Sequence, residues 1–73
     1  MVYNIRRNGA LGDGKTVNTR IIQNTIDQCH LAGGGTVLIE DGIYVSGTLF
    51  LRSNVILEIS QGAVLKASPD ITD

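Results

Sequence analysis

The second half of the chain repeats its pattern of apolar residues about every 20 positions. A shift of 20, the distance from Gly42 to Gly62, places apolar residues on apolar residues. The superimposed apolar pairs are Val37 with Leu57, Ile39 with Ile59, Ile43 with Ala63, and Val45 with Leu65. The pairs expected to face outward are Leu38 with Glu58 and Ser46 with Lys66. Such a repeat is typical of a β-helix, in which the strands of successive coils stack in parallel and share one buried inner face.

Short strands are expected throughout this repeat, because β-branched and alternating runs are separated by turn residues. The expected strands cover 36–40, 43–46, 48–51, 55–59 and 63–66. No helical pattern lies between them. A hairpin-linked sandwich or barrel would have the same strand spacing. The feature that favours a solenoid over these folds is the repeat.

One helix is expected ahead of the strands, from Thr19 to His30. We expect the Asn18 side chain to accept a hydrogen bond at the helix N-cap and Gly33 to supply the left-handed turn after the helix. The predicted buried face consists of Ile22, Ile26 and Cys29, which recur at i, i+4 and i+7.

Composition and charge exclude several classes of protein. The 73 residues are 42% hydrophobic, as expected for one soluble globular unit and not for a disordered tail. Six basic and seven acidic residues are scattered along the chain, so no binding surface for nucleic acid or anionic lipid is predicted. No apolar run approaches the roughly 20 residues of a membrane helix, and residues 1–4 lack the apolar stretch of a signal peptide.

The reactive side chains form no evident site in the sequence. Cys29 is the only cysteine and is expected to be a small apolar core residue. His30 is expected to interact with the negative end of the helix dipole and not with a metal. Glu40 and Asp41 are neighbours at a strand end, so their side chains should point to opposite faces. The remaining carboxylates considered, Glu58, Asp70 and Asp73, are expected to be solvated.

Residues 9–16 read GALGDGKT and match the pattern G-x-x-x-x-G-K-[ST] of a phosphate-binding loop. In such a loop backbone N–H groups hold phosphates, while the lysine and threonine contact phosphate and magnesium. The preceding strand should then be almost entirely apolar, but residues 2–7 alternate with polar and charged ones. We therefore favour a glycine-rich turn in which Asp13 bonds to local backbone N–H groups, and keep nucleotide binding as the remote alternative.

The same residues resemble a known protein family. Residues 9–19, GALGDGKTVNT, followed by Ile22-Gln23 and Ile26-Asp27, resemble the N-terminal signature of pectin-lyase-like β-helix proteins. The segments 33–37, 42–48, 51–55, 62–65 and 68–71 resemble its continuation in glycoside hydrolase family 28, the polygalacturonases. The chain departs from this pattern at Arg7-Asn8, where an acidic and then an aromatic residue are usual.

The resemblance implies an all-β fold, a right-handed parallel β-helix. Residues 1–73 would be the N-terminal cap and about the first two coils of a longer domain, with the helix covering the open end of the core. By family, the longer protein would be a secreted or periplasmic glycosidase that degrades cell-wall pectin. It would hydrolyse galacturonic-acid linkages with inversion, between carboxyl groups about 6.5–9.5 Å apart.

No functional residue is transferred to this chain by the resemblance. The family's catalytic motifs are Asn-Thr-Asp, Asp-Asp, Gly-His-Gly and Arg-Ile-Lys, and none occurs here. The predicted catalytic, cofactor-binding and metal-binding residues are therefore none, and this segment is expected to be structural. The expected partner of the longer protein is a pectic polysaccharide, with endo or exo cleavage and polygalacturonan or rhamnogalacturonan as open alternatives.

Two further expectations concern an alternative function and the oligomeric state of the chain. A bacterial surface protein or phage spike could use the same cap and coils to bind glycans without hydrolysis, because a fold does not fix a function. The last coil has no following coil in these 73 residues, so self-association through its strand edges is expected. The strands concerned carry Val55, Leu57, Ile59, Val64 and Leu65.

Overall fold

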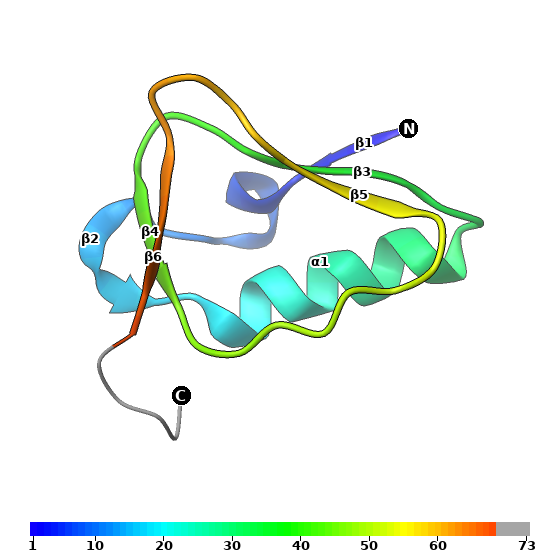
Figure 1. The fold of residues 1–73 in the computed structure, drawn as a ribbon, viewed down its shortest axis with the longest axis horizontal. Helices are drawn as coiled ribbons and strands as arrows, with labels where there is room; N and C mark the ends of the chain where they lie inside the picture. The colour runs from blue at the N-terminus through cyan, green and yellow to red at the C-terminus, as the bar shows by residue number, and fades with distance from the viewer. Residues whose placement is uncertain (69–73) are drawn as a thin grey trace.

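Two three-stranded parallel sheets form two sides of the molecule (Figure 1). The computed structural model describes residues 1–68. The first sheet contains β1 (Val2–Asn4), β3 (Gly35–Ile39) and β5 (Val55–Ile59), in that order. The second contains β2 (Asp13–Val17), β4 (Ile43–Ser46) and β6 (Val64–Ala67). Every strand pairs in parallel with the next strand but one along the chain, which confirms stacked coils and excludes hairpins between these strands.

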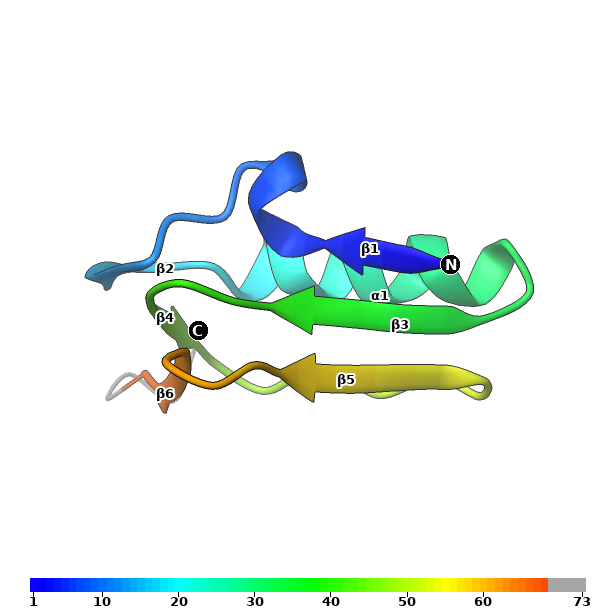
Figure 2. The ribbon, with the colours of Figure 1, turned by 90° about the horizontal axis from the view of Figure 1, so that it is seen from above.

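Two helical segments complete the first coil. The α-helix α1 (Thr19–Leu31) runs along the third side of the coil, beside the segment that connects β4 to β5 (Figure 1). The 3₁₀ helix η1 (Ile5–Asn8) lies within the outline of the coil when the molecule is viewed down its shortest axis. Figure 2 shows β1, β3 and β5 stacked in layers, with α1 behind the upper layers. Within residues 1–68, no helix has the length and apolar character needed to cross a membrane.

The expected cap is therefore shared between two elements. The predicted face of α1 is buried, since Ile22, Ile26 and Cys29 are fully inaccessible. However, α1 closes a side of the coil, and η1, with its fully buried Ile5, covers the end. The core cluster comprises Ile5, Ala10, Ile22, Ile26, Cys29, Val37, Ile39 and Tyr44. Burying each large aliphatic side chain stabilises the fold by about 1.5–3 kcal/mol, so η1 and α1 hold the coil by the same apolar contacts as the strands.

The predicted shift of 20 is confirmed in the first sheet. Val37 lies opposite Leu57, and Leu38 opposite Glu58. In the second sheet the expectation is wrong by one residue, because Ile43 lies opposite Val64, a shift of 21. The extra residue lies in the turn between β5 and β6, which spans 60–63, whereas the turn between β3 and β4 spans 40–42.

In β4 the core position is taken by Tyr44 and not by Ile43, and the extra residue before β6 brings Leu65 opposite Tyr44. Successive side chains of a strand point to opposite faces, so a slip of one residue exchanges the two sets. Tyr44 joins the core and pairs with Leu65, whereas Ile43 is 45% exposed. The expected pairing of Ile43 with Ala63 and of Val45 with Leu65 is therefore wrong, and Lys66 lies opposite Val45, not Ser46. The expected inward positions of Ala63 and Leu65 are confirmed, since both pack against the core.

Residues 48–51, expected to be a strand, are not paired as one. Leu49 packs against the core, whereas Phe50 is 69% and Leu51 63% exposed, so the side chains alternate only in part. The neighbouring element in the first coil is α1, whose backbone groups bond within the helix and offer no strand edge. This segment is therefore extended chain beside a helix.

Candidate functional site

Several backbone N–H groups of the glycine-rich segment 9–16 already bond to acceptors in the protein. The bonds run from Gly9 N to Arg6 O (3.1 Å), from Ala10 N to Ile5 O (3.2 Å), and from Leu11 N to Asn18 Oδ1 (2.9 Å). A phosphate-binding loop must present such N–H groups to its ligand. Here they are used to fold the turn.

Asp13 occupies the place where a phosphate would have to lie. Its Oδ1 accepts from Lys15 N at 2.9 Å and Thr16 N at 2.7 Å, and its Oδ2 accepts from Thr16 Oγ1 at 2.7 Å. These bonds, the Thr16 N–H first among them, lower the pKa of Asp13 from 3.8 to about 2. The expected role of Asp13 as a partner of local N–H groups is confirmed.

Gly12 serves the stacking of coils and not the binding of a ligand. A Cβ atom at Gly12 would lie 2.9 Å from Tyr44 Cζ and 3.1 Å from Gly42 Cα. Lys15 and Thr16 belong to strand β2, and α1 begins only at Thr19. The segment therefore lacks the helix N-terminus that a phosphate-binding loop requires.

We expect the chain not to bind nucleotide, because the lysine, the threonine and the N–H groups of segment 9–16 are not arranged around a free space. Isothermal titration with Mg²⁺-ATP checks this and should show no heat of binding. An Asp13→Ala variant should not gain binding either. A magnesium-dependent micromolar Kd for either protein would contradict the structure.

The titration of Asp13 gives a second test of the turn. Its pKa is lowered on folding, so the ionised carboxylate stabilises the folded chain above pH 3.8, and this contribution is lost as the pH falls toward 2. We expect a Thr16→Val variant, which lacks the hydroxyl donor, to raise the pKa of Asp13. Side-chain ¹³C chemical shifts followed against pH measure both values, and an Asp13 pKa near 3.8 in the unaltered chain would contradict the bonding described.

Asn18 does not form the expected N-cap bond. It precedes α1, but its side chain makes no cap hydrogen bond. Its Nδ2 instead donates to Leu11 O at 2.9 Å and to Thr16 O at 3.0 Å. Asn18 is 1% exposed, so an interior amide closes segment 11–17 against the core. The expectation for Gly33 is confirmed, since its φ is +101° and its N–H donates to His30 O at 3.0 Å.

The other reactive side chains do not converge. His30 Nδ1 donates to Ser53 O at 3.0 Å, and Cys29 is a buried free thiol. Glu40 Oε1 accepts from the Asn4 amide at 2.8 Å, and Asp41 lies 3.8 Å from the Arg6 guanidinium. Glu58 is exposed, whereas Asp70 and Asp73 lie outside the described residues. Among residues 1–68, no three histidine, cysteine or acidic side chains gather as metal ligands would.

The structure instead reveals a polar stripe on α1, formed by Thr19, Gln23, Asp27 and His30, that holds the backbone of residues 47–53. Thr19 Oγ1 accepts from Gly47 N at 2.7 Å. Gln23 Oε1 accepts from Phe50 N at 2.8 Å, and its Nε2 donates to Phe50 O at 2.9 Å. The polar stripe therefore provides the hydrogen bonds that a neighbouring strand would otherwise provide.

Asp27 fixes the end of this contact. Its Oδ1 accepts from Gln23 Nε2 at 3.1 Å and from Arg52 Nε at 3.0 Å. The Gln23 bond, followed by the Arg52 bond, lowers the pKa of Asp27. Sequence reasoning missed the polar stripe, although its spacing of four, four and three residues marks one face of a helix as clearly as the apolar stripe does.

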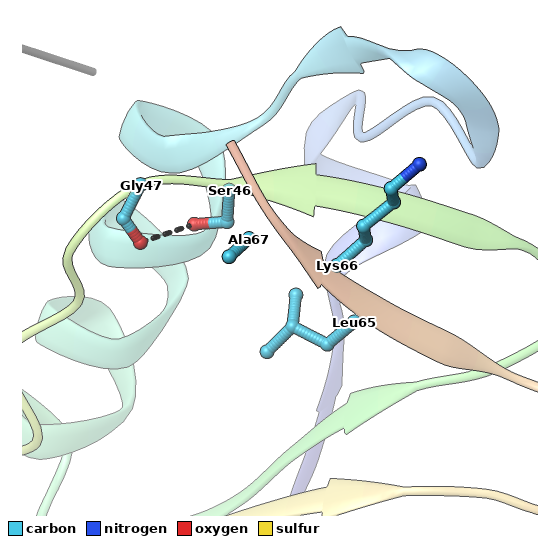
Figure 3. Close-up of a pocket in the computed structure, with 5 residues that line it drawn as sticks. All are labelled: Ser46, Gly47, Leu65, Lys66 and Ala67. Carbon is cyan, nitrogen blue, oxygen red and sulfur yellow. Dashed lines mark hydrogen bonds between the residues drawn. The ribbon is translucent and has the colours of Figure 1, made fainter. Parts of the chain in front are cut away.

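The far end of the coil stack is open. Strands β5 and β6 are the last in their sheets, and each has one edge without a partner strand among residues 1–68. A hollow of about 200 Å³ lies at this edge, lined by Ser46, Gly47, Leu65, Lys66 and Ala67. Figure 3 shows Leu65 and Lys66 on opposite sides of β6. The hollow thus lies beside an open strand edge and is not an enclosed pocket.

Known proteins contain segments similar to this chain. The exo-poly-α-D-galacturonosidase of Dickeya chrysanthemi is 40% identical over 72 residues, which make up 99% of this chain and 12% of that protein. The chain thus spans a small fraction of the length of this curated relative. No protein-family model matches the chain.

Solved structures show the same arrangement of elements. The family 28 exopolygalacturonase of Yersinia enterocolitica superimposes with a TM-score of 0.87 at 44% identity, over 93% of this chain and 12% of that one. The A-module of the mannuronan C-5 epimerase AlgE6 from Azotobacter vinelandii superimposes with a TM-score of 0.84 at 38% identity, over 90% of this chain and 20% of that one. The coil stack is thus common to enzymes named for different reactions.

Proposed function

We propose that this chain, which is homologous to segments of family 28 exopolygalacturonases and of alginate epimerase A-modules, forms the N-terminal end of a pectin-lyase-like β-helix in a longer carbohydrate-active enzyme. The observation that carries the proposal is the 40% identity that extends over 99% of the chain. In this role the chain is structural. It closes the first coil and presents a strand edge on which the next coil stacks.

The unpaired parts of the structure support this role. The outer edges of β5 and β6 have the backbone groups that a parallel strand needs. Along residues 47–53, the N–H and C=O of Phe50 bond to Gln23 on α1. Because backbone groups of an extended chain alternate between its two edges, those of Leu49 and Leu51 face away from α1. A third coil would pair with them and make residues 48–51 the strand that the sequence predicts.

We favour a pectic polymer as the substrate of the longer enzyme. In sequence alignment the galacturonosidase relative covers 99% of this chain, whereas the mannuronan epimerase AlgE6 covers 78%. Catalysis would then be inverting hydrolysis by carboxyl groups in later coils, and the enzyme would act where the polymer is found, in the periplasm or outside the cell. The 73 residues alone should release no reducing ends from polygalacturonate.

The second candidate is an enzyme that modifies alginate. It is favoured by the match to the mannuronan epimerase A-module, with a TM-score of 0.84. Mannuronan and polygalacturonate are both polymers of uronic acids. The same cap can therefore precede an active site for either polymer, and the later coils decide between them.

A pair of chimeras tests the proposal. In one, this chain replaces the matching segment of the Dickeya galacturonosidase, and in the other it replaces that of the AlgE6 A-module. We expect the first chimera to keep polygalacturonate cleavage within about tenfold of its parent, because the cap does not touch the reacting atoms. Activity of the epimerase chimera alone would favour the second candidate.

A deletion supplies the matched control. Removing Gln61 from the first chimera shortens the turn 60–63 by one residue, which would slip β6 against β4 and turn Leu65 out of the core. Activity should then fall far below that of the intact chimera. If both chimeras form soluble, folded proteins without activity, the proposed role as an interchangeable cap is wrong.

A further inference from the structure

A second hollow lies at the opposite end of the molecule, among β1, η1 and α1. Its volume is about 270 Å³, and Tyr3, Arg7, Asn8 and Gln28 are among the residues that line it. Sites for drug-sized ligands usually measure about 300–1,000 Å³. This hollow is therefore of a size for one sugar ring and not for an oligosaccharide.

Two exposed side-chain amides line the hollow, and one of them, that of Asn8, is anchored to the helix. Asn8 Nδ2 donates to Thr25 Oγ1 at 2.7 Å and, more weakly, to Gln28 Oε1 at 3.4 Å. Thr25 is fully buried and donates in turn to Ile21 O at 2.8 Å, so the Asn8 amide has a fixed support. Asn8 Oδ1 and Gln28 Nε2 make no hydrogen bond within residues 1–68. The hollow thus contains an oriented acceptor and a donor.

Arg7 adds a positive charge without a protein partner. Two other arginines do form ion pairs, Arg6 with Asp41 and Arg52 with Asp27. Arg7 forms no ion pair within the described part of the chain, and it is exposed. An arginine guanidinium is suited to bidentate hydrogen bonding with a carboxylate.

We propose that this hollow binds one uronic acid residue, with its carboxylate on Arg7 and its ring hydroxyls on the Asn8 and Gln28 amides. The choice of a uronate over other hydroxylated carboxylates rests on the proposed function with a polyuronate substrate. The site lies at the start of the coil stack, away from the later coils that would hold the catalytic residues. It would hold the polymer without reacting with it.

Amide NMR titration of the ¹⁵N-labelled chain with galacturonate tests the proposal. We expect shifts confined to the hollow, with a Kd in the millimolar range, and little response to galactose, which lacks the carboxylate. Arg7→Gln should weaken galacturonate binding about tenfold or more, because a hydrogen bond between charged groups contributes about 1.5–3 kcal/mol. Arg20→Gln removes the same charge from an exposed position outside the hollow and should leave binding unchanged.

The outcomes separate this site from the proposed function. Equal affinity for galactose, shifts elsewhere in the chain, no binding, or an Arg7→Gln variant that binds as tightly as the original would each overturn the proposal. If the isolated chain gives the spectrum of an unfolded protein, the same comparison is made on the galacturonosidase chimera, observing the Arg7 guanidinium signal. An active chimera with an empty hollow would refute only this site, and an inactive chimera with galacturonate in the hollow would refute only the proposed function.

Discussion

Replacing Gly34 with alanine is expected to unfold the isolated chain at 25 °C, whereas replacing its neighbour Gly33 should leave it folded. Both glycines have a positive φ, +101° at Gly33 and +109° at Gly34, so each substitution strains the backbone by about 1–2 kcal/mol. Only Gly34 lies against another segment: its Cβ would overlap the backbone carbonyl of Asn54 and lie 2.7 Å from Asn54 Cβ. At Gly33 no atom lies within 4 Å of the new methyl group.

The overlap at Gly34 adds about 1–3 kcal/mol or more to the strain, because the Asn54 backbone cannot move without disturbing the Gly35 N–H bond to Asn54 O, 2.9 Å long. A domain of this size has little stability to lose. Far-UV circular dichroism during urea unfolding measures both variants. If Gly33→Ala and Gly34→Ala lower the free energy of unfolding by the same amount, the close contact with Asn54 does not explain the need for glycine at position 34.

Covering the open end of the stack should change the chain from a self-associating, weakly stable protein into a stable monomer. The exposed edge of β5 and β6 carries unpaired backbone groups beside apolar side chains, and Ile56 is 64% and Val64 48% exposed. Two coils are fewer than the three or more that solenoids usually need. We expect fusion to the next four coils of the Dickeya relative to raise the Tm by more than about 10 °C.

A glycine- and serine-rich tail of the same length is the matched control, since it adds residues without adding strands. Light scattering after size-exclusion chromatography gives the oligomeric state, and thermal unfolding gives the Tm. The tail should change neither. An isolated chain that is monomeric and unfolds cooperatively with its edge uncovered would contradict the expectation that two coils need a third for stability.

Hydrophobic periodicity predicted the helices and strands that bury a single face. The helix begins at Thr19 as expected because its apolar stripe admits one orientation, and it ends one residue late, at Leu31. The first sheet follows the predicted shift because burial alternates along β3: Val37 and Ile39 are buried, and Leu38 between them is partly exposed.

The misplaced register of the second sheet has a physical reason. Ile43, Tyr44 and Val45 are all apolar, so the sequence pattern fits a core-facing strand in either phase. In the structure Tyr44 takes the core position, and the longer turn before β6, which cannot be recognised from polarity, lets Leu65 lie opposite it. The polar stripe of α1 was missed for a related reason, because hydrophobic periodicity takes no account of side chains that bond to a distant backbone.

The helix on the third side of the first coil gives the β-helix a direction. Hydrogen bonds within α1 use its backbone groups, so no strand can be added beyond it, whereas its side chains position the first extended segment on the other side. On this side of the coil, stacking can therefore proceed only toward the C-terminus. A ribosome delivers the chain in the same order, so each coil leaving the exit tunnel would meet an edge that is already in place.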